Sequence, residues 1–125
     1  MFKYQSTKNS GANSWVLQRI SGIVLVVLMI GHYILMHYSP ESGKSYEAVL
    51  ARMSFSWYRI IDLVFVTLGM YHGLNGIWGI FRDFDLKPWL KISVVTILIV
   101  LGIAFISWGY SIIFSIPYVK LFTLN

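Results

Sequence analysis

The stretch from residue 92 to residue 119, ISVVTILIVLGIAFISWGYSIIFSIPYV, contains no Lys, Arg, Asp or Glu. A helix needs roughly 20 apolar residues to cross about 30 Å of hydrocarbon, and this stretch is longer than that. It lacks the alternation of apolar and polar residues typical of barrel strands, and backbone groups in lipid must be paired within the segment. The stretch therefore predicts a transmembrane α-helix.

Two further apolar stretches precede it. Residues 20–38 carry no Lys, Arg, Asp or Glu, and residues 60–81 carry Asp62 as their only such charge. Both are long enough to span a bilayer. We therefore expect an all-α membrane protein with one domain over residues 1–125. The three expected spans cover about residues 15–38, 58–81 and 90–116.

The composition of the 125-residue chain agrees with a membrane location. Hydrophobic residues make up 57% of it, charged residues 12%, and the mean hydropathy is +0.67. The absence of cysteine excludes disulfides, thiolate metal sites and iron–sulfur ligation, so a redox metal would be held by histidine. The ten Lys and Arg residues are scattered, which indicates membrane orientation and not nucleic-acid binding.

The distribution of Lys and Arg predicts how the chain is oriented. Six of these residues lie before the first span or between the second and third, and four lie on the other side: Lys3, Lys8, Arg19, Arg82, Lys87 and Lys91 against Lys44, Arg52, Arg59 and Lys120. Positive residues favour the cytoplasmic side. We therefore expect a multi-pass protein of the cytoplasmic membrane, with a cytoplasmic N-terminus and an external first loop. Residues 45–53 of that loop are expected to form a short interfacial helix.

Two of the three histidines, His32 and His72, lie well inside the expected spans, where polar side chains are costly and indicate a function or a partner, whereas His37 is expected at the membrane interface. At about 100° per residue, His72 shares an arc of about 60° with Gly76, Gly79 and Asp83. An imidazole beside small residues suits a haem iron and the edge of its porphyrin. The same glycines equally suit close helix packing, with His72 hydrogen-bonded across the contact.

The two histidines are expected at different depths. The first span runs outward and the second inward, so His32 lies toward the outside and His72 toward the cytoplasm. They therefore cannot ligate one iron together. Two haems at different depths, or one haem and one structural histidine, both remain compatible with this placement.

Charged residues flank the expected spans at the cytoplasmic edge. Arg19 lies where a quinone headgroup or a haem propionate would arrive, and Asp83 is placed to relay protons. An ordinary positive flank and a charged helix end explain the same residues.

The residues also resemble a known family. The segment RISGIVLVVL at residues 19–28, followed by Gly31-His32, looks like the first helix of the hydrophobic anchor subunits of succinate dehydrogenase. The segment HGLNG at residues 72–76, with Asp83 eleven residues after the histidine, is similar to their second-helix signature. The likeness is greatest to the small anchor subunit of actinobacterial enzymes.

This resemblance implies a subunit of complex II, the succinate:quinone oxidoreductase, in which the three helices form part of a multi-subunit helix bundle. Its partners would be a flavoprotein subunit, an iron–sulfur subunit and a second membrane anchor. In this family, residues matching His72 hold haem b, and in members with two haems the residue matching His32 does so too. Residues matching Arg19, Ser21 and Asp83 lie near the bound quinone, which is either menaquinone or ubiquinone. Many relatives have a tyrosine after that aspartate, whereas this chain has Phe84, which cannot donate a hydrogen bond.

The function expected from the sequence is a cytochrome b-type anchor that helps pass electrons from succinate to quinone and is not an enzyme on its own. One alternative is a haem-free structural anchor, in which His72 only forms hydrogen bonds. Another is a small proton-coupled transporter or channel component, in which four residues form a proton path: His32, Asp62, His72 and Asp83.

Overall fold

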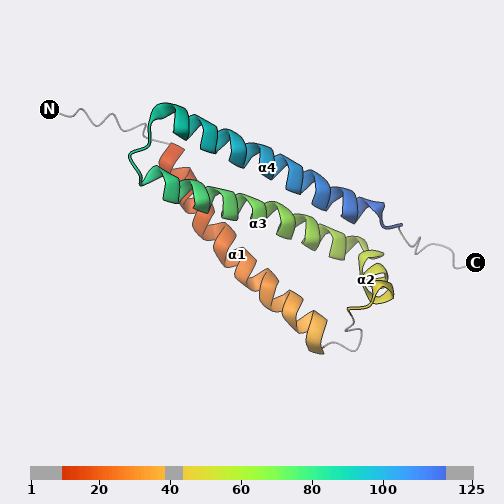
Figure 1. The fold of residues 1–125 in the computed structure, drawn as a ribbon. Helices are drawn as coiled ribbons and strands as arrows, with labels where there is room; N and C mark the ends of the chain where they lie inside the picture. Colours follow the sequence, from red (N-terminus) through yellow and green to blue (C-terminus); the bar gives the residue numbers. More distant parts are fainter. Residues whose placement is uncertain (1–9, 39–43, 118–125) are drawn as a thin grey trace, which may run out of the picture.

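The structure, a computed structural model, describes residues 10–38 and 44–117. Within these ranges it is helical and contains no strand, with four helices: α1 (Ser10–Tyr38), α2 (Tyr46–Met53), α3 (Ser56–Arg82) and α4 (Pro88–Ser115). The long helix α3 packs against both α1 and α4, and the short α2 packs against α3 (Figure 1). Lys3, Lys8 and Lys120, used to predict orientation, and the last residues of the 92–119 stretch lie outside the described residues.

The three expected spans correspond to α1, α3 and α4. Each of these helices is long and apolar enough to cross a membrane, which confirms the prediction of an all-α protein with three spans. The helix α1 begins at Ser10, before the first strongly apolar residues. The helix α4 begins at Pro88, whose missing N–H costs nothing in the first turn of a helix.

The predicted short helix in the first loop is also present. Ser45 is the N-cap of α2, and its hydroxyl accepts a hydrogen bond of 3.2 Å from the Ala48 backbone N–H. Glu47 lies in the first turn and Arg52 in the last, where their charges complement the helix dipole. Arg52 and Met53 at the end of α2 are buried.

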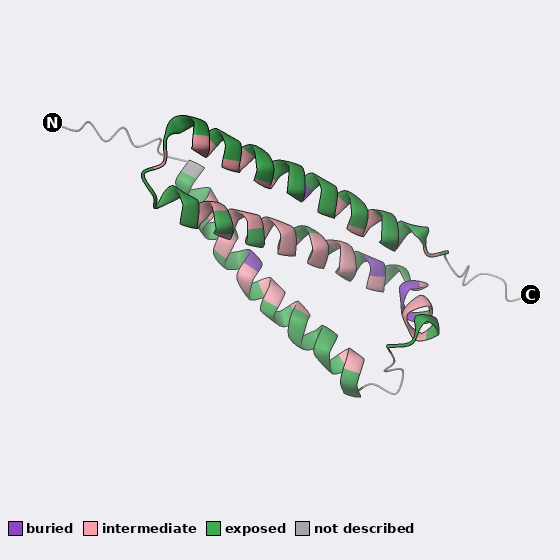
Figure 2. Ribbon diagram, in the orientation of Figure 1, coloured by how far each residue is buried: buried purple, intermediate pink, exposed green. Residues whose placement is uncertain are grey.

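The chain buries polar groups and exposes apolar ones. Figure 2 shows few buried positions on the long helices, and the described buried side chains include Ser21, Arg52 and Arg59. By contrast, long runs of Ile, Val, Leu and Phe on α1 and α4 are exposed. Helices in lipid gain little from burying apolar surface against one another, so small residues and hydrogen bonds hold them together.

The contact between α3 and α4 illustrates this packing. Gly109 of α4 faces Val66 of α3, and a Cβ added at Gly109 would lie 3.2 Å from Cγ1 of that valine. One hydrogen bond of 2.6 Å joins the hydroxyls of Thr67 and Tyr110 across the same pair of helices. The glycine lets the helices approach, and the hydroxyl pair fixes their register.

Arg59, near the start of α3, forms hydrogen bonds to the ends of both α2 and α4. This residue of α3 is 2% exposed, and its Nε donates to the Met53 carbonyl at the end of α2 at 2.5 Å. Its Nη2 donates to the carbonyls of Ile116 and Pro117 at the end of α4, at 2.5 and 3.1 Å. Carbonyls at helix ends lack partners within the helix, and a guanidinium satisfies several of them at once.

The two ends of the bundle differ in how closely α1 and α3 approach. We call the end with the start of α1 and the turn of residues 83–87 the turn end, and the end with α2 the α2 end. Figure 1 shows α1 and α3 crossing near the turn end and separating toward the α2 end. The functional residues predicted from the sequence are divided between these two ends.

Candidate functional site

His72 lies on α3 at the crossing with α1. Its Nδ1 is 3.1 Å from the backbone carbonyl oxygen of Gln18 and 3.1 Å from the hydroxyl oxygen of Ser21. The ring lies against the α1 backbone, because a Cβ added at Gly22 would be only 3.0 Å from the His72 Cε1. The absence of a side chain at Gly22 therefore makes room for the imidazole.

Gln18 makes the complementary contact. Its side-chain Nε2 donates to the His72 backbone carbonyl at 3.0 Å, and a Cβ added at Gly76 would lie 3.3 Å from that nitrogen. We call Gln18, Gly22, His72 and Gly76 the glutamine–histidine clasp. In each helix a polar side chain is followed four residues later by a glycine, and each side chain occupies the space over the other helix's glycine.

Two further residues extend the clasp toward the turn end. Asn75 Nδ2 donates to the Gln18 side-chain oxygen at 2.7 Å, and the Ser14 hydroxyl donates to Asn75 Oδ1 at 2.9 Å. The amide of Gln18 is therefore satisfied at both of its ends. A continuous hydrogen-bonded chain runs from Ser14 to His72 between the two helices.

A cavity of about 300 Å³ opens beside this chain at the turn end. Arg19 and Arg82 line it, together with Gly76 and Gly79 of the predicted histidine–glycine arc. The Arg19 guanidinium lies 3.8 Å from the centre of the Trp15 ring, a cation–π contact that fixes it at the cavity. Among the described residues, Asp83 does not line this cavity; it is the exposed C-cap of α3 at the same end.

Ser21 occupies a different position from Arg19, although both precede the apolar run of α1. Its side chain is 3% exposed, and its hydroxyl donates to the Gln18 carbonyl at 3.1 Å. The same oxygen is in hydrogen-bonding distance of His72. Ser21 therefore contacts the histidine, while Arg19 faces the cavity.

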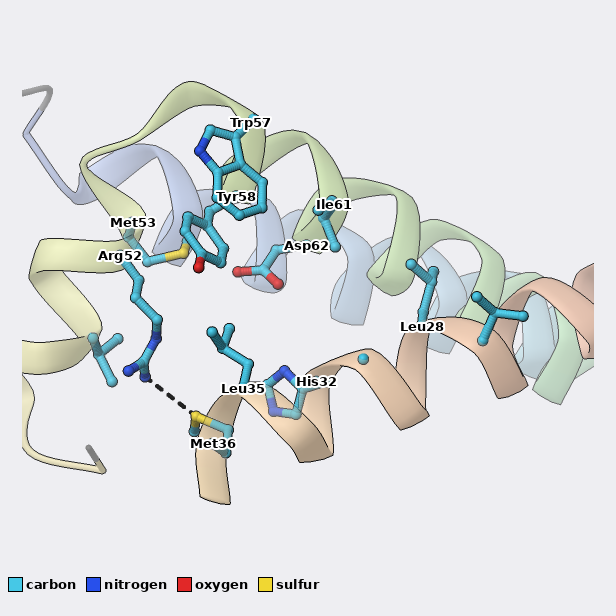
Figure 3. A pocket seen from close by; sticks show the side chains of 13 residues that line it. Leu28, His32, Leu35, Met36, Arg52, Met53, Trp57, Tyr58, Ile61 and Asp62 are labelled. Carbon is cyan, nitrogen blue, oxygen red and sulfur yellow. Dashed lines mark hydrogen bonds between the residues drawn. The ribbon is translucent and has the colours of Figure 1, made fainter. Parts of the chain in front are cut away.

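A larger cavity of about 440 Å³ lies at the α2 end, between α1, α2 and α3. Figure 3 shows His32 from α1 and Asp62 from α3 directed into it from opposite sides. Arg52 of α2 also lines it, and its Nη2 lies 3.3 Å from the sulfur of Met36. The remaining lining is mostly apolar, so the ionisable side chains of His32, Arg52, Tyr58 and Asp62 share an otherwise apolar space.

The two histidines are well separated. His72 lies opposite residues 18–22 of α1, and His32 lies about 15 Å farther along that helix at 1.5 Å per residue. The neighbour of His32 on α3 is Phe65, whose ring is nearly parallel to the imidazole with centres 6.5 Å apart. The structure thus places the two imidazoles at different levels, as the sequence predicts, and they cannot share one iron.

Gln18, Asn75 and Arg52 were not predicted as site residues from the sequence. The signal for the first two is a pattern that occurs in both helices: QRISG at residues 18–22 and HGLNG at residues 72–76. Each segment begins with a polar residue, has a second polar residue three positions later and has a glycine four positions later. Polar residues repeated on one face of a membrane helix indicate a helix–helix contact.

The side-chain donors of the described residues fit a haem better than a metal ion bound by protein side chains alone. Across residues 10–38 and 44–117, no group of three or more His, Cys, Asp or Glu residues is arranged to hold a metal ion. A haem iron needs only one or two axial ligands, because the porphyrin supplies the others. His72 is half-buried, and its neighbour Gly73 is exposed with no atom within 4 Å of an added Cβ. A flat ring can therefore approach α3 beside the imidazole.

Comparison with known proteins identifies similar sequences over most of the chain. A family model described as the succinate dehydrogenase/fumarate reductase transmembrane subunit matches residues 2–110.

Three similar proteins are each named succinate dehydrogenase hydrophobic membrane anchor subunit. The protein of Archaeoglobus fulgidus is 25% identical over 103 residues, which cover 82% of this chain and 88% of the relative. That of Coxiella burnetii is 24% identical over 107 residues, with the same coverage of 82% and 88%. That of Rickettsia typhi is 26% identical over 82 residues, which cover 66% of this chain and 64% of the relative.

Proposed function

The chain belongs to the succinate dehydrogenase/fumarate reductase transmembrane subunit family, and we propose that it binds haem b and quinone within such a complex. As a multi-pass membrane anchor, it would attach a flavoprotein subunit and an iron–sulfur subunit to the membrane and help pass electrons from succinate to quinone. In this proposal the chain acts as a subunit of the complex and is not an enzyme on its own.

The placement of His72 carries this proposal. The imidazole is held at one ring nitrogen by α1, and it lies beside an exposed glycine and near the cavity of Arg19. A bound haem would supply one-electron redox chemistry at this level of the bundle. The protein holds the imidazole and, at Gly73, leaves the space that a porphyrin needs.

We assign His32 to a second haem at the α2 end. It lines the 440 Å³ cavity together with Gly31, at which an added Cβ would meet no atom within 4 Å. The Arg52 guanidinium lines the same cavity, and arginine is well suited to pairing with carboxylates such as haem propionates. The donor, the space and the cation fit a haem, which a residue of a partner subunit would help to hold.

Quinone binding is assigned to the turn end. Arg19 lines the 300 Å³ cavity and offers hydrogen bonds to a quinone oxygen, while the exposed Asp83 carries protons from the aqueous side. Ser21 is buried against His72, so its contribution to cofactor binding passes through the histidine. The quinone is menaquinone or ubiquinone.

The proposed assembly explains the exposed apolar surface of the chain. Three long apolar helices with few buried side chains suit the lipid bilayer, and in the proposed complex a second membrane anchor would cover part of their surface. With the N-terminus in the cytoplasm, the turn end would face the catalytic subunits across the cytoplasmic membrane. The positive charges of Arg19, Arg82 and Lys87 at that end agree with this orientation.

Haem quantitation on the intact complex tests the proposal. The pyridine haemochrome assay should give two haems per flavin, and His72→Ala and His32→Ala should each remove a different haem signal. If only His72→Ala changes the visible spectrum, the chain holds one haem and His32 is a packing residue. If neither substitution changes the spectrum of the assembled complex, the hydrogen bonds of His72 to α1 are its only role and the anchor is structural.

A further inference from the structure

We propose that the glutamine–histidine clasp is a positioning device for the haem ligand, which makes Nδ1 of His72 the protonated ring nitrogen and presents Nε2 to the iron. This inference rests on the proposed haem-binding role of His72. It assigns roles to Gln18 and Gly22, and it links them to a measurable property of the haem.

The partners of Nδ1 determine which ring nitrogen carries the proton. The Gln18 backbone carbonyl, 3.1 Å from Nδ1, can only accept a hydrogen bond, so Nδ1 must be the donor. The Ser21 hydroxyl donates its own hydrogen to that carbonyl, which leaves its lone pairs directed to Nδ1 as a second acceptor. A neutral imidazole has one N–H, and therefore Nε2 keeps the lone pair that a metal requires.

The clasp fixes the ring as well as its proton. Gln18 Nε2 donates to the His72 carbonyl while His72 Nδ1 donates to the Gln18 carbonyl, so the two residues are joined in both directions. Gly22 and Gly76 leave room for the two side chains at 3.0 and 3.3 Å from where a Cβ would stand. Because α1 and α3 are antiparallel, the two halves of the clasp are related by a local two-fold axis.

The extension of the clasp sets the direction of the Gln18 amide. Asn75 Nδ2 donates to Gln18 Oε1, which turns Gln18 Nε2 toward the His72 carbonyl. The Ser14 hydroxyl donates to the Asn75 oxygen and fixes that amide in turn. Every donor in the chain from Ser14 to Gln18 therefore points toward the histidine, and such chains strengthen their members.

A carbonyl that accepts the Nδ1 proton has a definite effect on the haem. It increases the electron density of the imidazole and makes Nε2 a stronger ligand, which favours ferric over ferrous iron. Loosening the clasp should therefore raise the midpoint potential of the haem bound to His72. A role in helix packing alone predicts loss of stability without this shift.

Two substitutions in the assembled complex test the role of the clasp. Gly22→Ala adds a methyl group 3.0 Å from His72 Cε1 and displaces the ring, and Gln18→Leu removes the side-chain donor while it leaves the backbone carbonyl in place. The readouts are the midpoint potential of each haem and the EPR spectrum of the ferric haem. The matched control is Gly109→Ala, which adds a methyl group 3.2 Å from Val66 at the other face of α3.

We expect both clasp variants to raise the potential of one haem and shift its EPR signal, with Gly109→Ala unchanged. Asn75→Ala leaves the four clasp residues intact and should give a smaller rise of the midpoint potential. This variant takes the place of any clasp variant that does not assemble. Unchanged potential and EPR signals in these variants, with His72→Ala still removing a haem, would overturn the positioning role and leave the proposed function standing. Retention of both haem signals in His72→Ala would overturn the haem assignment itself.

Discussion

At the turn end, α1 and α3 meet through two glycines and a ladder of hydrogen bonds, whereas at the α2 end the same two helices, together with α2, enclose a cavity of about 440 Å³. The two ends differ in the residues that face the partner helix. Gly22 and Gly76 allow the backbones to approach at the crossing, while Leu35 and Tyr58 line the cavity at the other end. One helix pair therefore provides a tightly held histidine at one level and an accessible one at another.

The comparison also shows two ways of handling polar groups in a membrane. His72 is joined to α1 by direct hydrogen bonds, so its orientation is set within this chain. His32 and Asp62 face a shared cavity, where their environment depends on what fills it. Substitutions near His72 should therefore act through geometry, and those near His32 through the occupant of the cavity.

The largest expected effect concerns which end faces the cytoplasm. Lys44 and Asp85 are both exposed, at the α2 end and the turn end respectively. Positive charges favour the cytoplasmic side, so with the proposed orientation an impermeant thiol reagent added outside intact cells should label Lys44→Cys and not Asp85→Cys. Labelling of Asp85→Cys alone would invert the orientation. Permeabilised cells, in which both cysteines react, are the control.

The next largest effect is expected at Arg59, which holds the α2 end together. Arg59→Ala removes hydrogen bonds to three carbonyls at helix ends, and it should lower the free energy of unfolding by about 3 kcal/mol. Chemical denaturation of the purified complex in detergent measures this change. Arg82→Ala, at an exposed position on the same helix, is the matched control. Equal stability of the two variants would show that the carbonyls find other partners.

A smaller effect is expected for quinone chemistry at the turn end. A hydrogen bond to a charged group contributes about 1.5–3 kcal/mol, so Arg19→Ala should slow quinone reduction at least about tenfold. Asp83→Asn should slow it as well, because it removes the proposed proton carrier. Succinate oxidation by a soluble artificial acceptor should be unchanged, because that reaction does not need the membrane site. Asp85→Asn, two residues from Asp83 and equally exposed, is the control. Equal loss of both activities would indicate failed assembly.

The smallest effect compares one methyl group at the two ends. An added Cβ at Gly31 meets no atom within 4 Å, so Gly31→Ala should raise the free energy of unfolding by about 0.5–1 kcal/mol, because alanine favours the helix more than glycine does. At Gly22 the same methyl group presses on His72, and overpacking should cost about 1–2 kcal/mol. Denaturation curves of the two variants measure the difference. Equal effects would mean that α1 shifts freely at the crossing.

The course of the chain was predictable from hydropathy. Three apolar stretches longer than a bilayer requires must form helices, because lipid offers no partners to the backbone, and α1, α3 and α4 confirm this. The short α2 was predictable from its apolar face, and its N-cap Ser45 agrees. The different levels of His32 and His72 also followed from the sequence, since helix rise and alternating direction fix depth.

The contacts of His32 and His72 depend on the tertiary structure and could not be predicted from the sequence. Periodicity places His72 on a face with Gly76, but it does not say how α3 is rotated against α1 or where the two helices cross. The sequence therefore left haem ligation and helix packing as alternatives. The structure shows that Nδ1 of His72 forms a hydrogen bond with α1. Because an imidazole has a second ring nitrogen, the same histidine can pack against α1 and ligate a haem. Gln18 contacts His72 only because the helix crossing places the Gln18 side chain over Gly76. The two hydrogen-bonded residues, Gln18 and His72, are 54 residues apart in the chain.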